Sequence, residues 1–320
     1  MKIQEIAKLA GVSPSTVSRV FSHHPNISEE IRERVFAISR QYAYHPRLSN
    51  KQRNVVIITP YQSVYPVQCC VEMILMALTR ELPRRGFRLE ILPQDNLERL
   101  DAIQFCAAAA IGVEPKDFQH WADRFSVPLV LLDREAELNS QEVYLVRSDE
   151  AQGMELALEH LYENGCRRIG CIIHGSPGTG NVDIRQDAIR RFLQKKGLPA
   201  DHSLIYFGPD EAYLEIIGKL LRQKIDALFC PGGSGGILAA YALSLFGKQV
   251  PDDISLIASE QTFFSRYGIP PQTTITPDYQ AMASAVADVI EDRISGRKHA
   301  VRTVLPYLLI RRESVRAASV

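Results

Sequence analysis

The sequence contains no apolar run that approaches the roughly eighteen uninterrupted residues a membrane-spanning helix requires. Its first residues, MKIQEIAKLAG, include an acid early and no long apolar segment of the kind that forms a secretory signal. Apolar residues make up 46% of the 320 positions and charged residues 23%, which allows a sizeable core divided into two or three lobes. These features predict a soluble globular protein of the cytoplasm with no membrane partner.

Cysteine and tryptophan are scarce. None of the six cysteines belongs to a C-x-x-C pair, and their spacing matches neither a zinc site nor a disulfide framework. We therefore expect no metal and no cofactor, and we interpret the cysteines as buried thiols. They are Cys69, Cys70, Cys106, Cys166, Cys171 and Cys230. The one tryptophan, Trp121, is expected to pack a helix.

The chain has no net charge, but its charges are unevenly distributed. Residues 1–53 contain nine Lys or Arg and four acids, a surplus of five positive charges, and the remainder has the opposite surplus. A basic segment ahead of an acidic body suggests a polyanionic partner for that segment alone. Charge by itself is equally compatible with a solvated surface.

The N-terminal residues show the start and stop signals of three short helices. Apolar residues at helical spacing from Ile3 onward predict a first helix that Gly11 ends in a left-handed conformation. Ser13 as N-cap and Pro14 at the first helical position predict a second helix, and a third begins after Ser28. Two short helices joined through Gly-Val-Ser form a helix-turn-helix.

The second helix separates apolar from hydroxyl-bearing residues. Val17, Val20 and Phe21 share the inward side, and the other side consists of Ser15, Thr16, Ser18 and Arg19. Short hydroxyl side chains allow close approach to a DNA major groove and bond phosphates, while an arginine can read guanine O6 and N7. The alternative is an ordinary surface helix in which Ser and Thr occur by chance.

The segment IQEIAKLAGVSPSTVSRVFSHHPNISEEIRERVFAISRQYAYHP resembles the DNA-binding head of the lactose and galactose repressor (LacI/GalR) family. The resemblance implies that Pro14, Ser15 and Arg19 read bases, with Pro14 limited to apolar contact such as with a thymine methyl. It also implies a set of phosphate contacts: Ser13, Thr16, Ser18, Asn26 and Ser28. The partner would be a palindromic double-stranded operator.

The junction that follows departs from the family pattern. The family usually has a short hinge helix whose leucine wedges into the minor groove, but here only RLSNKQR separates YAYHP from an expected strand at Val55. Leu48 is one candidate for the wedge. The simpler interpretation is a flexible linker whose Arg47, Lys51 and Arg53 contact phosphates. We expect a head at 1–46, a shortened linker at 47–54 and a core at 55–320.

From residue 55 onward, expected strands and helices alternate. Segments such as VVIITP and AAAAIGV read as buried strands, whereas LERLDAIQFC, DFQHWADRF and MELALEHLYENG read as helices. This alternation predicts an α/β fold with two lobes of parallel sheet covered by helices on both faces. The region also resembles the family core, which is similar to periplasmic sugar-binding proteins, is usually dimeric and binds a small effector between its lobes.

The resemblance implies effector contacts at Asp149, Arg185 and Glu260, the last where an aspartate is usual. Each has an alternative: Asp149 caps the next helix, Arg185 pairs with a surface acid, and Glu260 points away. Where the family has Asn-Asp, this chain has PGGSGG at 231–236, which places Gly232, Gly233 and Ser234 in the site. We hypothesise that bare amides there favour an anionic or bulkier group, such as that of a sugar derivative; a merely permissive turn is the alternative.

Aromatic residues and two enzyme-like motifs complete the candidates. Tyr61 and Phe263 are expected to stack on an effector ring, although such residues more often belong to the core. Gly232-x-Ser234-x-Gly236 followed by Asp278 and His299 imitates a hydrolase, and GSPGTGN lacks the lysine of a phosphate-binding loop. We therefore do not expect an enzyme. We expect a homodimeric transcriptional regulator, most simply a repressor, that is controlled by a sugar or sugar-like effector. The alternative is a small-molecule binding protein with a vestigial head.

Overall fold

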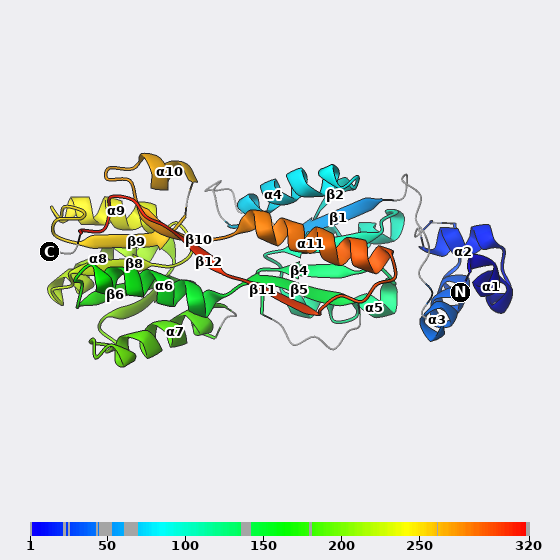
Figure 1. Ribbon diagram of the computed structural model, residues 1–320, viewed down its shortest axis with the longest axis horizontal. Coiled ribbons are helices and arrows are strands. Elements are labelled where there is room, and N and C mark those ends of the chain that lie inside the picture. The colour runs from blue at the N-terminus through cyan, green and yellow to red at the C-terminus, as the bar shows by residue number, and fades with distance from the viewer. Residues whose placement is uncertain are drawn as a thin grey trace. The chain divides into compact units, whose positions relative to one another are not determined.

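The computed structural model describes residues 2–21, 24, 26–42, 44, 53–60, 70–135, 142–178, 181–260 and 262–317. The chain divides into two compact units (Figure 1). The first unit comprises residues 1–66, 70–147 and 279–304, and the second comprises 67–69, 148–278 and 305–320. None of the helices in the described ranges has the length and apolarity that crossing a membrane requires.

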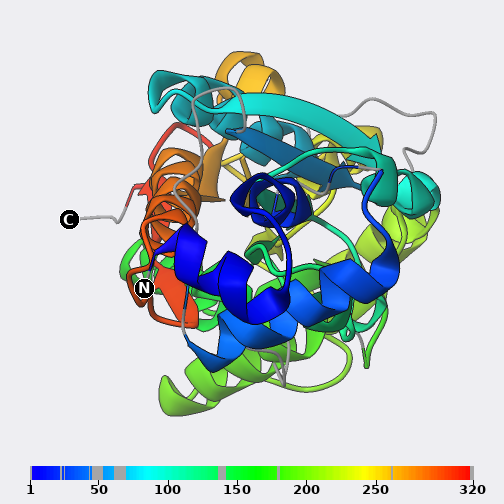
Figure 2. The same ribbon diagram turned by 90° about the vertical axis from the view of Figure 1, so that its right-hand side faces the viewer.

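The N-terminal segment forms the three expected helices, α1 (Ile3–Ala10), α2 (Pro14–Phe21) and α3 (Glu29–Gln41). Figure 2 shows these blue helices packed against one another. Gly11 ends α1 with a φ of +64°, as expected for a left-handed stop. The ring of Phe21 meets those of Phe36 and Tyr44 edge to face, at centroid distances of 5.6 and 5.9 Å. Their shared core consists of Ile6, Ala7, Ala10, Val17, Val20, Phe21, Val35, Phe36 and Tyr44.

The sheet of the first unit has the strand order β11-β5-β4-β3-β1-β2. The strands are β1 (Asn54–Thr59), β2 (Arg88–Pro93), β3 (Ala107–Ile111), β4 (Leu129–Leu132), β5 (Val143–Ser148) and β11 (Arg302–Leu305). The pairs from β2 through β5 are parallel. Helices α4 (Cys70–Arg84) and α11 (Tyr279–Ile294) pack against each other beside the sheet (Figure 1).

The sheet of the second unit has the strand order β12-β10-β9-β8-β6-β7. Its strands are β6 (Ile169–His174), β7 (Ile205–Gly208), β8 (Ala227–Cys230), β9 (Ser255–Ser259), β10 (Thr273–Pro277) and β12 (Tyr307–Ile310). Its helices are α6 (Glu150–Glu163), α7 (Asn181–Lys195), α8 (Tyr213–Arg222), α9 (Gly235–Leu245) and α10 (Thr262–Tyr267), with one 3-10 turn at Asp210–Ala212.

Side chains of β6 point alternately to the two faces of this second sheet. Cys171 and Ile173 pack with α6 and α7, whereas Ile172 packs with α8 and α9. Helices therefore cover both faces, as the alternating pattern predicts. The expected parallel arrangement fails at one edge of this sheet, because β12 pairs with β10 in the antiparallel sense.

Two expected helices are wrong in kind. LERLDAIQFC forms part of a 3-10 segment at Gln94–Ala102, where Asn96 leaves the helical conformation and its side chain bonds Asp95. DFQHWADRF divides into a 3-10 turn at Pro115–Phe118 and the single-turn helix α5 (Trp121–Arg124). So short a segment cannot propagate a stable helix. Trp121 is buried as expected, and its indole N–H donates to the Val127 carbonyl at 2.8 Å.

The prediction of buried thiols is wrong for Cys70, which is exposed because it lies at the first residue of α4. Four other cysteines are buried: Cys106, Cys166, Cys171 and Cys230. Burial raises the pKa of the Cys106 and Cys171 thiols to about 12, so both remain protonated at neutral pH. Cys69 lies outside the described residues.

Close packing between α6 and β12 depends on the absence of a side chain at Gly153. A Cβ there would lie 2.7 Å from Cγ and Cδ2 of Tyr307. The ring cannot easily withdraw, because the Tyr307 hydroxyl donates to Glu150 at 3.1 Å and its amide donates to Gln152 at 2.8 Å. We expect Gly153→Ala to lower the free energy of unfolding by about 1 to 3 kcal/mol, measured by chemical denaturation.

A suitable control for this substitution is Glu155→Ala, which changes an exposed side chain on the same helix. It should alter the free energy of unfolding by no more than about 0.5 kcal/mol. Equal stabilities of the two variants would contradict the close approach of Tyr307.

Candidate functional site

The first turn of α2 is held together by hydroxyl groups around Ser13. The Thr16 amide donates to Ser13 Oγ at 3.0 Å, so Ser13 caps the helix as expected. The same oxygen lies 2.7 Å from Ser15 Oγ and 2.8 Å from Thr16 Oγ1. Pro14 needs no amide partner at this position. The turn is therefore ordered before any ligand arrives.

The outward side of α2 carries the residues expected to read bases. Pro14, Ser15 and Arg19 are exposed, and Thr16 and Ser18 are half-buried. No acidic residue lies in the first turn of the helix. An exposed edge with hydroxyl groups, one guanidinium and no carboxylate suits a polyanionic partner.

Two further candidates, Asn26 and Ser28, lie before α3 and are exposed. Ser28 occupies the N-cap position, but its side chain makes no hydrogen bond to the amides of α3, all of which lie in the described part. The Asn26 amide donates to Nδ1 of His24 at 3.3 Å, which shapes the loop. Both side chains are thus presented on the surface near the start of a helix.

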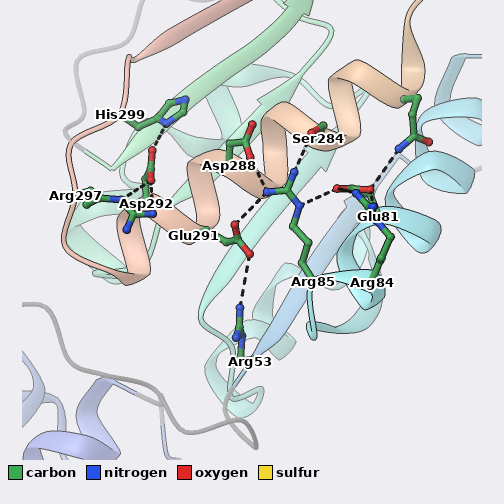
Figure 3. A network of polar contacts seen from close by, with 11 residues as sticks. Arg53, Glu81, Arg84, Arg85, Ser284, Asp288, Glu291, Asp292, Arg297 and His299 are labelled. Atoms are coloured by element: carbon green, nitrogen blue, oxygen red, sulfur yellow. Dashed lines mark hydrogen bonds and ion pairs between the residues drawn. The ribbon is translucent and has the colours of Figure 1, made fainter.

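Of the three linker residues expected to contact phosphates, only Arg53 lies among the described residues. Arg47 and Lys51 lie outside the described residues. Arg53 packs onto the body of the first unit, with its guanidinium carbon 4.3 Å from the centroid of the Phe87 ring. Its NH2 lies 4.0 Å from Glu291 (Figure 3). These contacts favour a role other than the expected phosphate contact.

In the second unit, Arg185 of α7 is fixed by a buried carboxylate. Its Nε and NH2 donate to the two oxygens of Glu150 at 2.7 and 2.8 Å. Glu150 is only 1% exposed and also accepts from Asn181 Nδ2 and the Tyr307 hydroxyl, each at 3.1 Å. Arg185 does pair with an acid, as the alternative held, but the acid is interior and not at the surface. The four bonds fix the carboxylate, and the two from Arg185 hold the guanidinium in one orientation.

The glycines after β8 lie directly against two side chains. A Cβ on Gly232 would lie 2.6 Å from Arg185 NH1, and one on Gly233 would lie 2.4 Å from Nδ1 of His174. Both glycines have positive φ, +87° and +54°. Only glycine fits there, since the arginine and the histidine occupy the space that a side chain would need. The structure therefore brings Arg185, Gly232 and Gly233 together and adds His174.

Backbone amides at this loop are less available than the sequence suggests. The Gly232 amide donates to Ser259 Oγ at 2.7 Å, so one of the proposed anion donors is already engaged. Ser234 occupies the N-cap position of α9, and its side chain makes no hydrogen bond to the amides of that fully described helix. The loop thus ends in a hydroxyl at the start of α9.

Of the remaining effector candidates, Asp149 and Glu260 bond to other groups of the second unit. Asp149 caps α6 by accepting from the Gln152 amide at 3.1 Å, which is its alternative role. Glu260 accepts from both terminal nitrogens of Arg312 at 2.9 and 3.0 Å and from the Thr274 hydroxyl. Phe263 is 70% exposed and lies against Tyr267, so it is not a core residue. Tyr61 lies outside the described residues.

The enzyme-like motifs gain no support from the geometry. Nδ1 of His299 lies 2.8 Å from a carboxylate oxygen of Asp292, and the other oxygen of Asp292 accepts from Arg297 (Figure 3). All three residues belong to the first unit. Hydrogen bonds from His299 and Arg297 lower the pKa of Asp292. In the segment that imitates a phosphate loop, the Gly178 amide donates to the carboxylate of Asp183, where a phosphate would be expected.

Comparison with known proteins agrees with this description. Residues 2–47 match the bacterial regulatory proteins of the lacI family, and residues 158–315 match a periplasmic binding protein-like domain. The transcriptional regulator DegA of Bacillus subtilis is 27% identical, over 98% of this chain and 97% of its own length. The repressor PurR of Haemophilus influenzae strain PittEE is 25% identical, over 97% of each.

Solved structures agree as well. The CelR–cellobiose complex is 25% identical and has a TM-score of 0.71, over 98% of this chain and 99% of that one. The lac repressor dimer bound to operator and an anti-inducer is 20% identical with a TM-score of 0.68, over 99% of both chains, which shows the shared fold. The N-terminal domain is thus a helix-turn-helix of the lacI family of bacterial regulatory proteins, it is joined to a periplasmic binding protein-like domain, and the relatives that match nearly the whole chain are transcriptional regulators.

Proposed function

We propose that the protein is a sequence-specific DNA-binding repressor of transcription whose operator affinity is controlled by a small-molecule effector. One observation carries this proposal: three helices with a core of their own expose Pro14, Ser15 and Arg19 on one edge of α2. In this proposal residues 1–46 are the DNA-binding head and residues 47–54 the linker. The protein would act in the cytoplasm, where chromosomal DNA is found, and it would catalyse no reaction.

Each exposed residue has a separate task at the operator. Arg19 would donate to O6 and N7 of a guanine, and Pro14 would contact a thymine methyl. Ser15, already hydrogen-bonded to Ser13, would present its hydroxyl in a fixed direction. Ser13, Thr16, Ser18, Asn26 and Ser28 would bond phosphates, as would Arg47 and Lys51 of the linker.

Arg19→Ala should relax base preference at one position of each half-site and cost about 1 to 3 kcal/mol of binding free energy. Lys51→Ala is the matched control: it should weaken binding to all sequences alike and flatten the dependence of affinity on salt. The measurement is fluorescence anisotropy on an operator obtained by in vitro selection and on its single-base variants. An Arg19→Ala protein with unaltered base preference would refute the assignment.

The effector site is proposed at the carboxyl edge of the second unit's sheet, where Arg185, His174 and the glycine loop meet. Glu150 balances the charge of Arg185, and Arg312 balances that of Glu260. The Gly232 amide is engaged by Ser259. These pairings favour a neutral polyhydroxyl ligand, a sugar, over the anionic derivative that the loop sequence suggests.

A neutral sugar that binds should raise the melting temperature, by an amount equivalent to about 2.7 kcal/mol at 100 times its Kd. We would screen cellobiose, other disaccharides and hexoses against hexose phosphates. The double variant Arg185→Gln/Glu150→Gln, which leaves no unpaired buried charge, should lose the shift while remaining folded. Larger shifts with the phosphates would overturn the neutral-sugar proposal, and a shift retained by the double variant would place the site elsewhere.

A palindromic operator needs two heads, and the second unit offers a surface on which two copies can pair. Apolar side chains are exposed on α9 and in the segment from α10 to residue 269, where Ile269 is fully exposed. They are Tyr241, Leu245, Phe263, Tyr267 and Ile269. A groove of about 280 Å³ between α9 and this segment is lined by Ala240, Phe264 and Pro270 among others. A surface with both a groove and a protruding apolar residue suits self-association about a two-fold axis.

Ile269→Asp should therefore shift the protein toward monomer and weaken operator binding, because a charge would be buried in the interface. Leu214→Asp, at another exposed apolar residue of the second unit, is the control and should leave the dimer intact. Sedimentation velocity measures the outcome. A monomeric parent protein, or an Ile269→Asp protein as dimeric as its parent, would contradict the proposed surface.

A further inference from the structure

The linker enters the first unit at Arg53, and this residue is held by its side chain. The guanidinium lies over the Phe87 ring at 4.3 Å. It also lies within 4.0 Å of Glu291 on α11 (Figure 3). Only 29% of the Arg53 side chain is exposed. A half-buried arginine stacked on an aromatic ring is poorly placed to follow a DNA backbone.

The backbone and the next side chain fix the same point. The Arg53 carbonyl accepts from the Arg88 amide at 2.7 Å, and the Asn54 carbonyl accepts from the Cys106 amide at 2.8 Å. The Asn54 side-chain amide donates to Glu90 at 3.1 Å and to the Gln104 carbonyl at 3.0 Å. Residues 53 and 54 are therefore tied to neighbours on both sides of β1.

Glu291, the partner of Arg53, is itself positioned by other charges. Arg85, which directly follows α4, donates to Glu291 at 3.1 Å and to Asp288 at 2.5 Å, while its NH2 donates to Ser284 at 2.8 Å (Figure 3). The Nε of Arg85 donates to the buried Glu81 at 2.7 Å. The carboxylate facing Arg53 thus belongs to a network that joins α4 to α11.

We propose that Arg53 is a positioning residue for operator binding, which fastens the end of the linker to the first unit and does not contact DNA. This inference rests on the proposed function, because it concerns how two heads of a dimer reach one palindrome. Once one head is bound, the other binds with an effective concentration set by the length of free chain. Releasing residues 53 and 54 would lengthen that chain and reduce the effective concentration.

The proposal and the phosphate-contact hypothesis predict different salt dependence. We expect Arg53→Ala to weaken operator binding about two- to fivefold with an unchanged slope of log K against log salt. Loss of a phosphate contact would instead reduce the slope by about 0.9 for each head. Arg88→Ala removes an exposed positive charge from β2, the strand beside the linker end, and should change neither affinity nor slope. A reduced slope, or an unchanged affinity, for Arg53→Ala would overturn the proposal.

A measurement without DNA separates this inference from the proposed function. In the full chain, hydrogen exchange of the Cys106 amide, which reports on the Asn54 carbonyl, should be at least threefold faster in Arg53→Ala than in the parent or in Arg88→Ala. The melting temperature should stay within a degree or two of the parent. Unchanged exchange would refute the fastening role even if the operator is bound, whereas failure of the parent to bind any duplex would refute the proposed function alone.

Discussion

A buried charge is tolerated only where its partner is fixed, and this constraint joins distant segments in both units. In the second unit Glu150 draws together α6, α7 and β12 through Arg185, Asn181 and Tyr307. In the first unit, hydrogen bonds from Arg84 and Arg85 lower the pKa of Glu81. Arg85 also donates to Asp288 of α11. Removal of Arg185, for example, would leave the buried Glu150 without its charged partner. The supports of the proposed effector site and of the linker end are therefore parts of the core.

The two networks differ in the part of the molecule that each one supports. The Glu150 network lies within the second unit, and Arg185 is its member nearest the glycine loop. A ligand that contacts Arg185 would meet a preorganised guanidinium, because its two hydrogen bonds to Glu150 already fix its orientation in the free protein. The network around Arg85 contacts the linker end through Glu291 of α11. This helix begins where the chain returns from the second unit to the first.

Local signals were sufficient to predict the head. A cap at Ser13, a proline at the first helical position and a glycine stop depend on neighbours a few residues away, and the structure has all three as expected. The alternation of strands and helices also predicted the α/β core. It did not reveal that β12 runs antiparallel, because that depends on where the chain returns to the sheet.

Partners far apart in the sequence could not be predicted in the same way. Glu150 and Arg185 are 35 positions apart, and Glu150 and Tyr307 are 157 apart. Nothing around Glu150 distinguishes it from the acid of an ordinary helix start. The paired glycines at 232–233 did signal a close approach, but which side chain approached, His174, depends on strand order in the sheet.

Neither unit is a continuous stretch of chain, since, besides the short segment 67–69, the backbone changes unit at residues 147–148, 278–279 and 304–305. During synthesis, α11 and β11 leave the ribosome only after residues 148–278 have emerged. Until then, one side of α4 and the edge of β5 remain uncovered in the first unit. Most of the second unit has already been synthesised at that stage and can fold. That unfinished surface stays exposed on the nascent chain until residues 279–305 have emerged, and exposed apolar surface and unpaired strand edges favour aggregation.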